Sequence, residues 1–366
     1  MRSDSLGGRG VSPGARQLMM RAWRQPGGPP PATAGSVGAL LREGVGRLEA
    51  AGLPRARQDA EWLLAWLAGV PRWRLTLEPD HPVAEEVSER FRELVDRRRR
   101  WEPLQYLLGW EDFRGLRLRV TPAVLVPRPE TELLVEWALE LLSELSAGAY
   151  KAGVAQPGGP PLIIDLGTGS GAIALALAVA NPDLTVYAVD QAPEALALAR
   201  ENVAALGMAA RVLLFQGDLF DPLGLLAGAV DLVISNPHYI PSATIPALPR
   251  EVREYEPIEA LDGGPDGMSV HRKIIAETPR FLRPGGWLLL EMGEGHSDHL
   301  SQLLEAVGFT DVQVRKDLSG VERMIGARLV GLGPAADGGR GAARGPAADV
   351  GREINAQEVK ANGGAA

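Results

Sequence analysis

The chain has 366 residues, of which 45% are hydrophobic and 23% are charged, and its net charge is −8. This composition predicts a globular protein of one or two domains, and the acidic balance argues against wrapping of duplex DNA, which needs a basic surface. The absence of cysteine excludes disulfides, thiolate chemistry and Cys-ligated metals, and we expect no metal site.

The first segment, residues 1–35, is rich in Gly, Pro and Arg and has no apolar core. This pattern predicts a disordered extension and argues against a signal peptide. The paired Met19 and Met20 leave open a start of translation further along the chain. No later apolar run approaches the length of a membrane span. We therefore expect a cytoplasmic protein without a membrane partner.

A helical domain is predicted for residues 36–109, because apolar residues such as Leu63 and Leu67 recur on one helical face. Four arginines, residues 97–100, close its last helix. Their positive charges are expected to stabilise the C-terminal end of that helix, and the alternative is contact with an acidic partner. Alternating apolar and charged residues within 110–126 then predict a hairpin that links the domains.

Strands and helices alternate through residues 127–330, which predicts an α/β fold with a doubly wound sheet. Within this domain a short apolar strand, 162–166, precedes a glycine loop, 167–171, and a helix, 172–180. Glycines allow a backbone to turn sharply and to approach a ligand closely. The last segment, 331–366, is rich in Gly and Ala and predicts a disordered tail.

An acidic residue, Asp190, ends the next apolar strand, at the spacing from a glycine loop that suits ribose hydroxyls. The loop also fits the loose pattern of nicotinamide enzymes. Against that alternative, Asp165 is a poor neighbour for a pyrophosphate, and no basic residue lies between Asp165 and Asp190. S-adenosylmethionine, with a cationic centre, an amino group and a ribose, fits such a site better.

The tetrapeptide Asn236-Pro237-His238-Tyr239 follows the apolar strand 230–235, where open α/β sheets bind their ligands. The Asn236 amide oxygen and the Pro237 carbonyl can each accept a hydrogen bond, and Tyr239 offers a flat face. Together they suit the capture of a planar NH2 group. The alternative is an ordinary turn at the end of a strand.

Two of these segments resemble a known family. Residues 165–171 resemble motif I of class I S-adenosylmethionine-dependent methyltransferases, and residues 236–239 resemble the Asn-Pro-Pro-Tyr motif of those that methylate a planar NH2. The family has Pro where this chain has His238. Further segments are similar to the release factor glutamine methyltransferases, the PrmC/HemK family: 126–132, 256–261, 266–268, 284–287 and 317–320.

The resemblance implies a seven-stranded Rossmann-like sheet, a helical substrate-recognition domain, and methylation of the glutamine in the Gly-Gly-Gln motif of peptide chain release factors. The implied catalytic residues are Asn236, Pro237 and Tyr239, and His238 joins them in substrate binding. The implied S-adenosyl-L-methionine residues are Gly167, Thr168, Gly169, Ser170, Gly171, Asp190, Asp218, Leu219 and Asn236.

Several alternatives stay open at this point. Residues 128–131 resemble the family loop that covers the cofactor, or form a linker before a helix that starts at Thr131. Glu291 follows an apolar strand and is expected to be structural. The rival functions are a ribosomal-protein glutamine methyltransferase, an adenine-N6 nucleic-acid methyltransferase and a non-catalytic binding protein. No sequence-specific contact with nucleic acid is expected.

Overall fold

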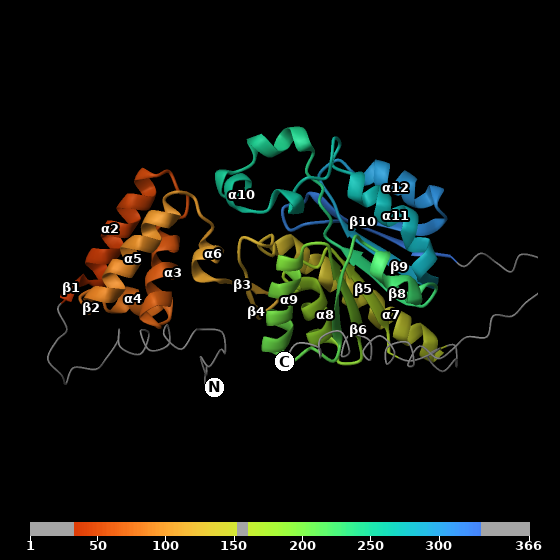
Figure 1. The fold of residues 1–366 in the computed structure, drawn as a ribbon, viewed down its shortest axis with the longest axis horizontal. Helices are drawn as coiled ribbons and strands as arrows, with labels where there is room; N and C mark the ends of the chain where they lie inside the picture. The colour runs from red at the N-terminus through yellow and green to blue at the C-terminus, as the bar shows by residue number, and fades with distance from the viewer. Residues whose placement is uncertain (1–32, 152–159, 331–366) are drawn as a thin grey trace, which may run out of the picture. The chain divides into compact units, whose positions relative to one another are not determined.

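The computed structural model describes residues 33–151 and 160–330, which form two compact units (Figure 1). The helical unit contains the described residues up to 111, together with 119–122 and 247–257. The sheet unit contains the other described residues. The two predicted disordered ends lie outside the described residues, apart from 33–35. Among the described residues, no helix is long and apolar enough to cross a membrane.

The helical unit packs short amphipathic helices around a core of leucine, valine and Phe91 side chains. Ser36 begins the first helix by accepting a hydrogen bond from the Ala39 N–H at 3.4 Å, and Gly69, with φ of 67°, ends the second. Its elements are β1 (Thr33–Ser36), α2 (Val37–Ala50), α3 (Ala56–Ala68), α4 (Arg72–Leu77), β2 (Pro82–Ala84), α5 (Glu85–Arg98), α6 (Leu104–Leu108) and α10 (Arg250–Tyr255).

The arginine run at the end of α5 is largely paired within this unit. The buried Arg98 guanidinium lies 2.7 Å from Asp59 and 2.9 Å from Glu251, and it donates to the Glu102 carbonyl at 2.9 Å. Arg97 binds the Glu102 carboxylate, and Arg99 lies 2.8 Å from Asp96. These pairs give three of the four arginines a structural role.

The sheet unit is built on seven strands in the order β10-β11-β9-β8-β5-β6-β7. Strands β5 to β9 pair in parallel, and β11 runs antiparallel to both of its neighbours. The strands are β5 (Leu162–Leu166), β6 (Thr185–Asp190), β7 (Val212–Gln216), β8 (Val230–Ser235), β9 (Leu282–Glu291), β10 (Phe309–Lys316) and β11 (Glu322–Leu329). The predicted doubly wound, seven-stranded α/β fold is confirmed.

Helices cover both faces of this sheet, so its central strands are mostly apolar on both faces rather than alternating. On β5, Ile163 packs into the core under α7, α8 and α9, whereas Ile164 packs into the core under α11 and α12 (Figure 1). These helices are α7 (Pro129–Lys151), α8 (Ala172–Ala180), α9 (Pro193–Leu206), α11 (Ser269–Phe281) and α12 (Ser297–Ala306). The remaining short elements are β3 (Trp110–Phe113), β4 (Leu116–Arg119), η1 (Asp221–Leu226), η2 (Ser242–Ala247) and η3 (Ile258–Ala260).

Candidate active site

Both sequence motifs lie at the point where the strand order of the sheet reverses. Strand β5 has β6 on one side and β8 on the other, so the loops after β5 and β8 leave the sheet at adjacent carboxyl ends. Such a switch point is where open α/β sheets bind ligands. The Ser235 hydroxyl donates to the Leu166 carbonyl at 2.7 Å and ties these two strand ends together.

The glycine loop after β5 adopts a backbone that only glycine accepts without strain. Gly167 and Gly169 have φ of 67° and 55°, and a Cβ added at either would meet no protein atom within 4 Å. The loop is held by Asp190, which accepts from the Gly169 N–H at 2.8 Å and from the Ala192 N–H at 2.9 Å. A carboxylate has about four acceptor sites, so Asp190 keeps capacity for ribose hydroxyls.

Asp165 lies wholly buried beneath this loop. One of its oxygens accepts from the Thr168 hydroxyl at 2.7 Å and from the Ala174 N–H at 3.2 Å, whereas the other has no hydrogen-bond partner. Burial raises the pKa of Asp165 to about 7. An incompletely satisfied buried carboxyl group favours a cationic ligand nearby, so the residues present fit S-adenosylmethionine better than a pyrophosphate.

The predicted adenine residues follow β7. Asp218 is exposed and lies 3.4 Å from Lys273, while Leu219 is half-buried with an unusual φ of 49°. A branched side chain in the left-handed region is uncommon and marks a backbone held by its surroundings. Their contact with adenine stays a prediction.

Asn236 leads the motif after β8 and belongs to a buried hydrogen-bond network. Its side-chain nitrogen donates to the Thr131 hydroxyl at 3.1 Å, and that hydroxyl donates to Glu291 at 2.6 Å. The Tyr239 hydroxyl donates to the other Glu291 oxygen at 3.0 Å. We call these four residues, Thr131, Asn236, Tyr239 and Glu291, the Glu291 network. The motif follows β8, as the sequence predicted, whereas Glu291 was expected only to be structural and no partner was predicted for it.

The first turn of α7 supplies Thr131 to this network. The helix begins at Pro129, so the alternative in which it starts at Thr131 is wrong by two residues. Proline suits a first helical position because the N–H that it lacks has no partner there. Thr131 is therefore already inside the helix, with only 4% of its surface exposed.

His238 and Tyr239 are fixed by the loop that returns toward α11. The Ile240 N–H donates to the Leu261 carbonyl at 3.1 Å, and the Gly263 N–H donates back to the Ile240 carbonyl at 2.9 Å. Burial lowers the pKa of His238, partly offset by nearby acidic groups. His238 is therefore neutral at pH 7 and adds no charge to the site.

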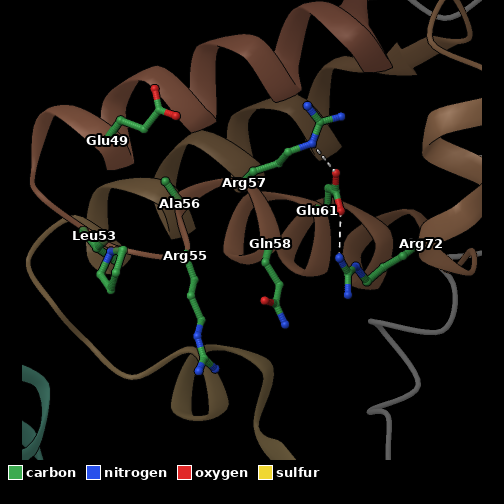
Figure 2. A pocket seen from close by; sticks show the side chains of 9 residues that line it. Glu49, Leu53, Arg55, Ala56, Arg57, Gln58, Glu61 and Arg72 are labelled. Atoms are coloured by element: carbon green, nitrogen blue, oxygen red, sulfur yellow. Dashed lines mark hydrogen bonds and ion pairs between the residues drawn. The ribbon is translucent and has the colours of Figure 1, made fainter.

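A surface pocket in the helical unit is separate from these motifs. Figure 2 shows Arg57 and Arg72 converging on Glu61, at 2.9 and 2.7 Å. Arg72 also stacks on the Trp62 ring at 5.0 Å. Because Arg57, Glu61 and Arg72 pair with one another, these three side chains have a structural role.

Comparison with known proteins now defines the class. Residues 39–109 match the PrmC N-terminal domain family, and residues 162–321 match a methyltransferase domain family. The chain therefore contains a methyltransferase domain.

The curated relatives define the particular family. The chain is 43% identical over 284 residues to release factor glutamine methyltransferase of Geobacter sulfurreducens. The aligned residues make up 78% of this chain and 93% of that protein. It is 44% identical over 284 residues to the protein of the same name from Moorella thermoacetica, covering 77% and 95%. The chain belongs to the release factor glutamine methyltransferase family.

A solved structure also matches part of the chain. It is the protein-(glutamine-N5) methyltransferase (release factor-specific) of Alicyclobacillus acidocaldarius, at 28% identity and a TM-score of 0.33. The match covers 58% of this chain and 99% of that one.

Proposed function

We propose that this protein transfers a methyl group from S-adenosyl-L-methionine to the side-chain amide nitrogen of the glutamine in the Gly-Gly-Gln motif of peptide chain release factors. The observation that carries the proposal is the pair of acceptors, Asn236 and Pro237, at the switch point of the sheet. The relatives of the chain, which are named release factor glutamine methyltransferase, support it. The proposed partner is thus a protein, not a nucleic acid.

The difficult step is attack by an amide nitrogen, because its lone pair is delocalised into the carbonyl group. The Asn236 side-chain oxygen and the Pro237 carbonyl accept the two hydrogens of the substrate NH2 and fix its orientation. Positive charge develops on that nitrogen during transfer, so both hydrogen bonds strengthen in the transition state. Correct placement alone can contribute about 7 kcal/mol or more.

S-adenosylmethionine supplies a methyl group that is already activated by its positive sulfur. The chain's own residues bind and orient: Gly167 and Gly169 allow close approach of the backbone, and Asp190 accepts from the ribose. The product nitrogen becomes acidic after transfer and loses its proton easily, so the mechanism needs no base before methyl transfer.

Mass spectrometry of a release factor, incubated with the protein and S-adenosylmethionine, tests the proposal. We expect a single added methyl group on the Gly-Gly-Gln glutamine. The variant Asn236→Ala should lower kcat about a hundredfold or more while cofactor affinity stays largely intact. The variant Asp190→Ala should instead raise the cofactor Kd by about tenfold or more. Full activity of Asn236→Ala would remove Asn236 from the mechanism.

A further inference from the structure

Glu291 is a buried carboxyl group to which the mechanism above gives no task. It ends β9, directly beside β8 in the sheet, and only 1% of its surface is exposed. We propose that Glu291 and Thr131 are positioning residues that decide which end of the Asn236 side-chain amide faces the substrate.

The direction of the hydrogen bonds follows from counting protons. In its ionised form the Glu291 carboxylate can only accept, so the Thr131 and Tyr239 hydroxyls, at 2.6 and 3.0 Å, then both point their protons at Glu291. The Thr131 oxygen then has only lone pairs left to offer. Asn236, 3.1 Å away, must turn its NH2 group toward that oxygen. The orientation of this amide is set by its partners, as for any asparagine.

This assignment rests on the proposed reaction, in which the orientation of the Asn236 amide decides whether Asn236 can accept a hydrogen bond from the substrate. With its NH2 group held by Thr131, Asn236 directs its oxygen away from the network and can accept a hydrogen of the substrate amide. In the reversed orientation, two NH2 groups would face each other, and the Asn236 oxygen would meet the lone pairs of Thr131. The Glu291 network therefore makes Asn236 an acceptor.

The variant Glu291→Gln should reverse the whole network without removing any side-chain volume. The Tyr239 hydroxyl holds the new amide by its oxygen, so the amide nitrogen donates to Thr131. The Thr131 proton then turns to Asn236, whose amide flips and presents its NH2 group to the substrate. The expected result is a fall in kcat of about tenfold or more, with cofactor affinity unchanged.

A double-mutant cycle gives the sharper test. In the wild-type background, Asn236→Asp places a carboxylate oxygen against the Thr131 lone pairs and should lower kcat strongly. In the Glu291→Gln background the Thr131 proton points at that carboxylate, whose other oxygen can accept from the substrate. We expect the second substitution to be at least about tenfold less harmful there. Additive effects would overturn the proposal.

A matched pair at Thr131 keeps the proposal testable if a Glu291 variant does not fold. Thr131→Val keeps the shape but loses the hydroxyl, whereas Thr131→Ser keeps the hydroxyl. We expect Thr131→Val to lower kcat about tenfold with cofactor Kd nearly unchanged and with a lower melting temperature, because the buried Glu291 carboxylate loses a donor, and Thr131→Ser to restore most of the activity and stability. Equal activity of the Val and Ser variants contradicts the positioning role. A wild-type protein that does not methylate release factor would instead overturn the proposed function itself.

Discussion

Asp165, at the end of β5 beneath the glycine loop, has a strongly perturbed environment. It is fully buried, one oxygen lacks a partner, and burial raises its pKa to about 7. The folded-state pKa lies above the ordinary aspartate pKa of 3.8. The folded protein therefore holds an extra proton between these values, and the free energy of unfolding falls as pH rises from about 4 to about 7. A cationic cofactor should relieve that cost.

We therefore expect cofactor affinity to depend on pH through Asp165. As pH rises from 6 to 8, Asp165 ionises and attracts the sulfonium and ammonium groups, so the Kd should fall by roughly threefold to tenfold. Isothermal titration calorimetry across this range measures it. The control is Asp165→Asn, whose affinity should be weaker and independent of pH. Wild-type affinity that does not change with pH would show that Asp165 has no contact, direct or electrostatic, with the cofactor.

His238 occupies the position at which the family motif Asn-Pro-Pro-Tyr has its second proline, and its neighbours Pro237 and Tyr239 match that motif. The variant His238→Pro should keep or modestly raise activity, because a proline at a compatible φ stabilises by roughly 0.4–1 kcal/mol and stiffens the loop. The pH–rate profiles of both proteins provide the measurement. Burial lowers the His238 pKa below its ordinary value of 6.5, so the imidazole is neutral at pH 7 and above, and the two profiles should coincide there.

We expect any fall in the rate at low pH to come from Glu291 rather than from His238. Burial raises the pKa of Glu291, near Glu130 of α7, while two hydroxyl hydrogen bonds and Arg323 of β11 lower it. Protonation of Glu291 resembles the Glu291→Gln change, so the rate should fall in acid, and it should do so equally in His238→Pro. A strong loss of activity in His238→Pro, together with loss of the acid limb, would make His238 catalytic.

At the scale of elements, the loop before α11 supports the substrate motif through one glycine. Gly267 has φ of 76°, and a Cβ there would collide with the Tyr239 carbonyl oxygen. The variant Gly267→Ala should therefore shift Tyr239 and lower kcat by about tenfold or more, in addition to costing about 1 kcal/mol of stability for its left-handed φ. Steady-state kinetics and thermal unfolding measure the two effects.

Gly320 provides the matched control for that substitution. Its φ of 83° is equally unfavourable for alanine, but a Cβ there meets no atom within 4 Å. Gly320→Ala should lose similar stability and keep its kcat. If both variants lose only stability, the contact between Gly267 and Tyr239 does not control the geometry of the motif.

The elements that sequence predicted well are those buried on both sides. Strands 162–166 and 230–235 have the predicted bounds, because central parallel strands are mostly apolar runs between loops. Strand β9 extends further back than its apolar run, which begins at Trp287, because Pro284 and the two following glycines precede that run and a register shift occurs there.

The site was predictable only where it is local in sequence. The glycine loop and the Asn236 motif each follow a strand, so their place at one sheet edge follows from the fold class. The Glu291 network joins residues 105 and 160 positions apart, and no periodicity or motif links them. The available signal for the Glu291 network was an acidic residue, Glu291, at the end of an apolar strand. Only the strand order, which puts β9 beside β8, shows that this residue lies near Asn236.

At the scale of the whole molecule, the chain returns to the helical unit at residues 247–257, after the substrate motif in sequence. Residues 247–257 run from the end of η2 to the start of η3, yet they belong to the helical unit, where α10 places Glu251 beside Arg98. Arg98 also pairs with Asp59, so one buried guanidinium joins α3, α5 and α10. Burial raises the pKa of Asp59, and the Arg98 charge opposes that rise.

The variant Arg98→Met should therefore destabilise the helical unit. It leaves the Asp59 carboxylate buried without its cation, a change that typically costs about 3–5 kcal/mol. Glu251→Gln removes a partner whose side chain is 38% exposed, and should cost less than about 1 kcal/mol. Urea unfolding followed by circular dichroism compares the two variants. The Arg98→Met defect should shrink as pH falls, because a protonated Asp59 needs no cation, and Asp59→Asn should recover part of it. A defect that is equal at pH 5 and pH 8, and that Asp59→Asn leaves unchanged, would mean that Arg98 stabilises the unit through packing of its stem rather than through its charge.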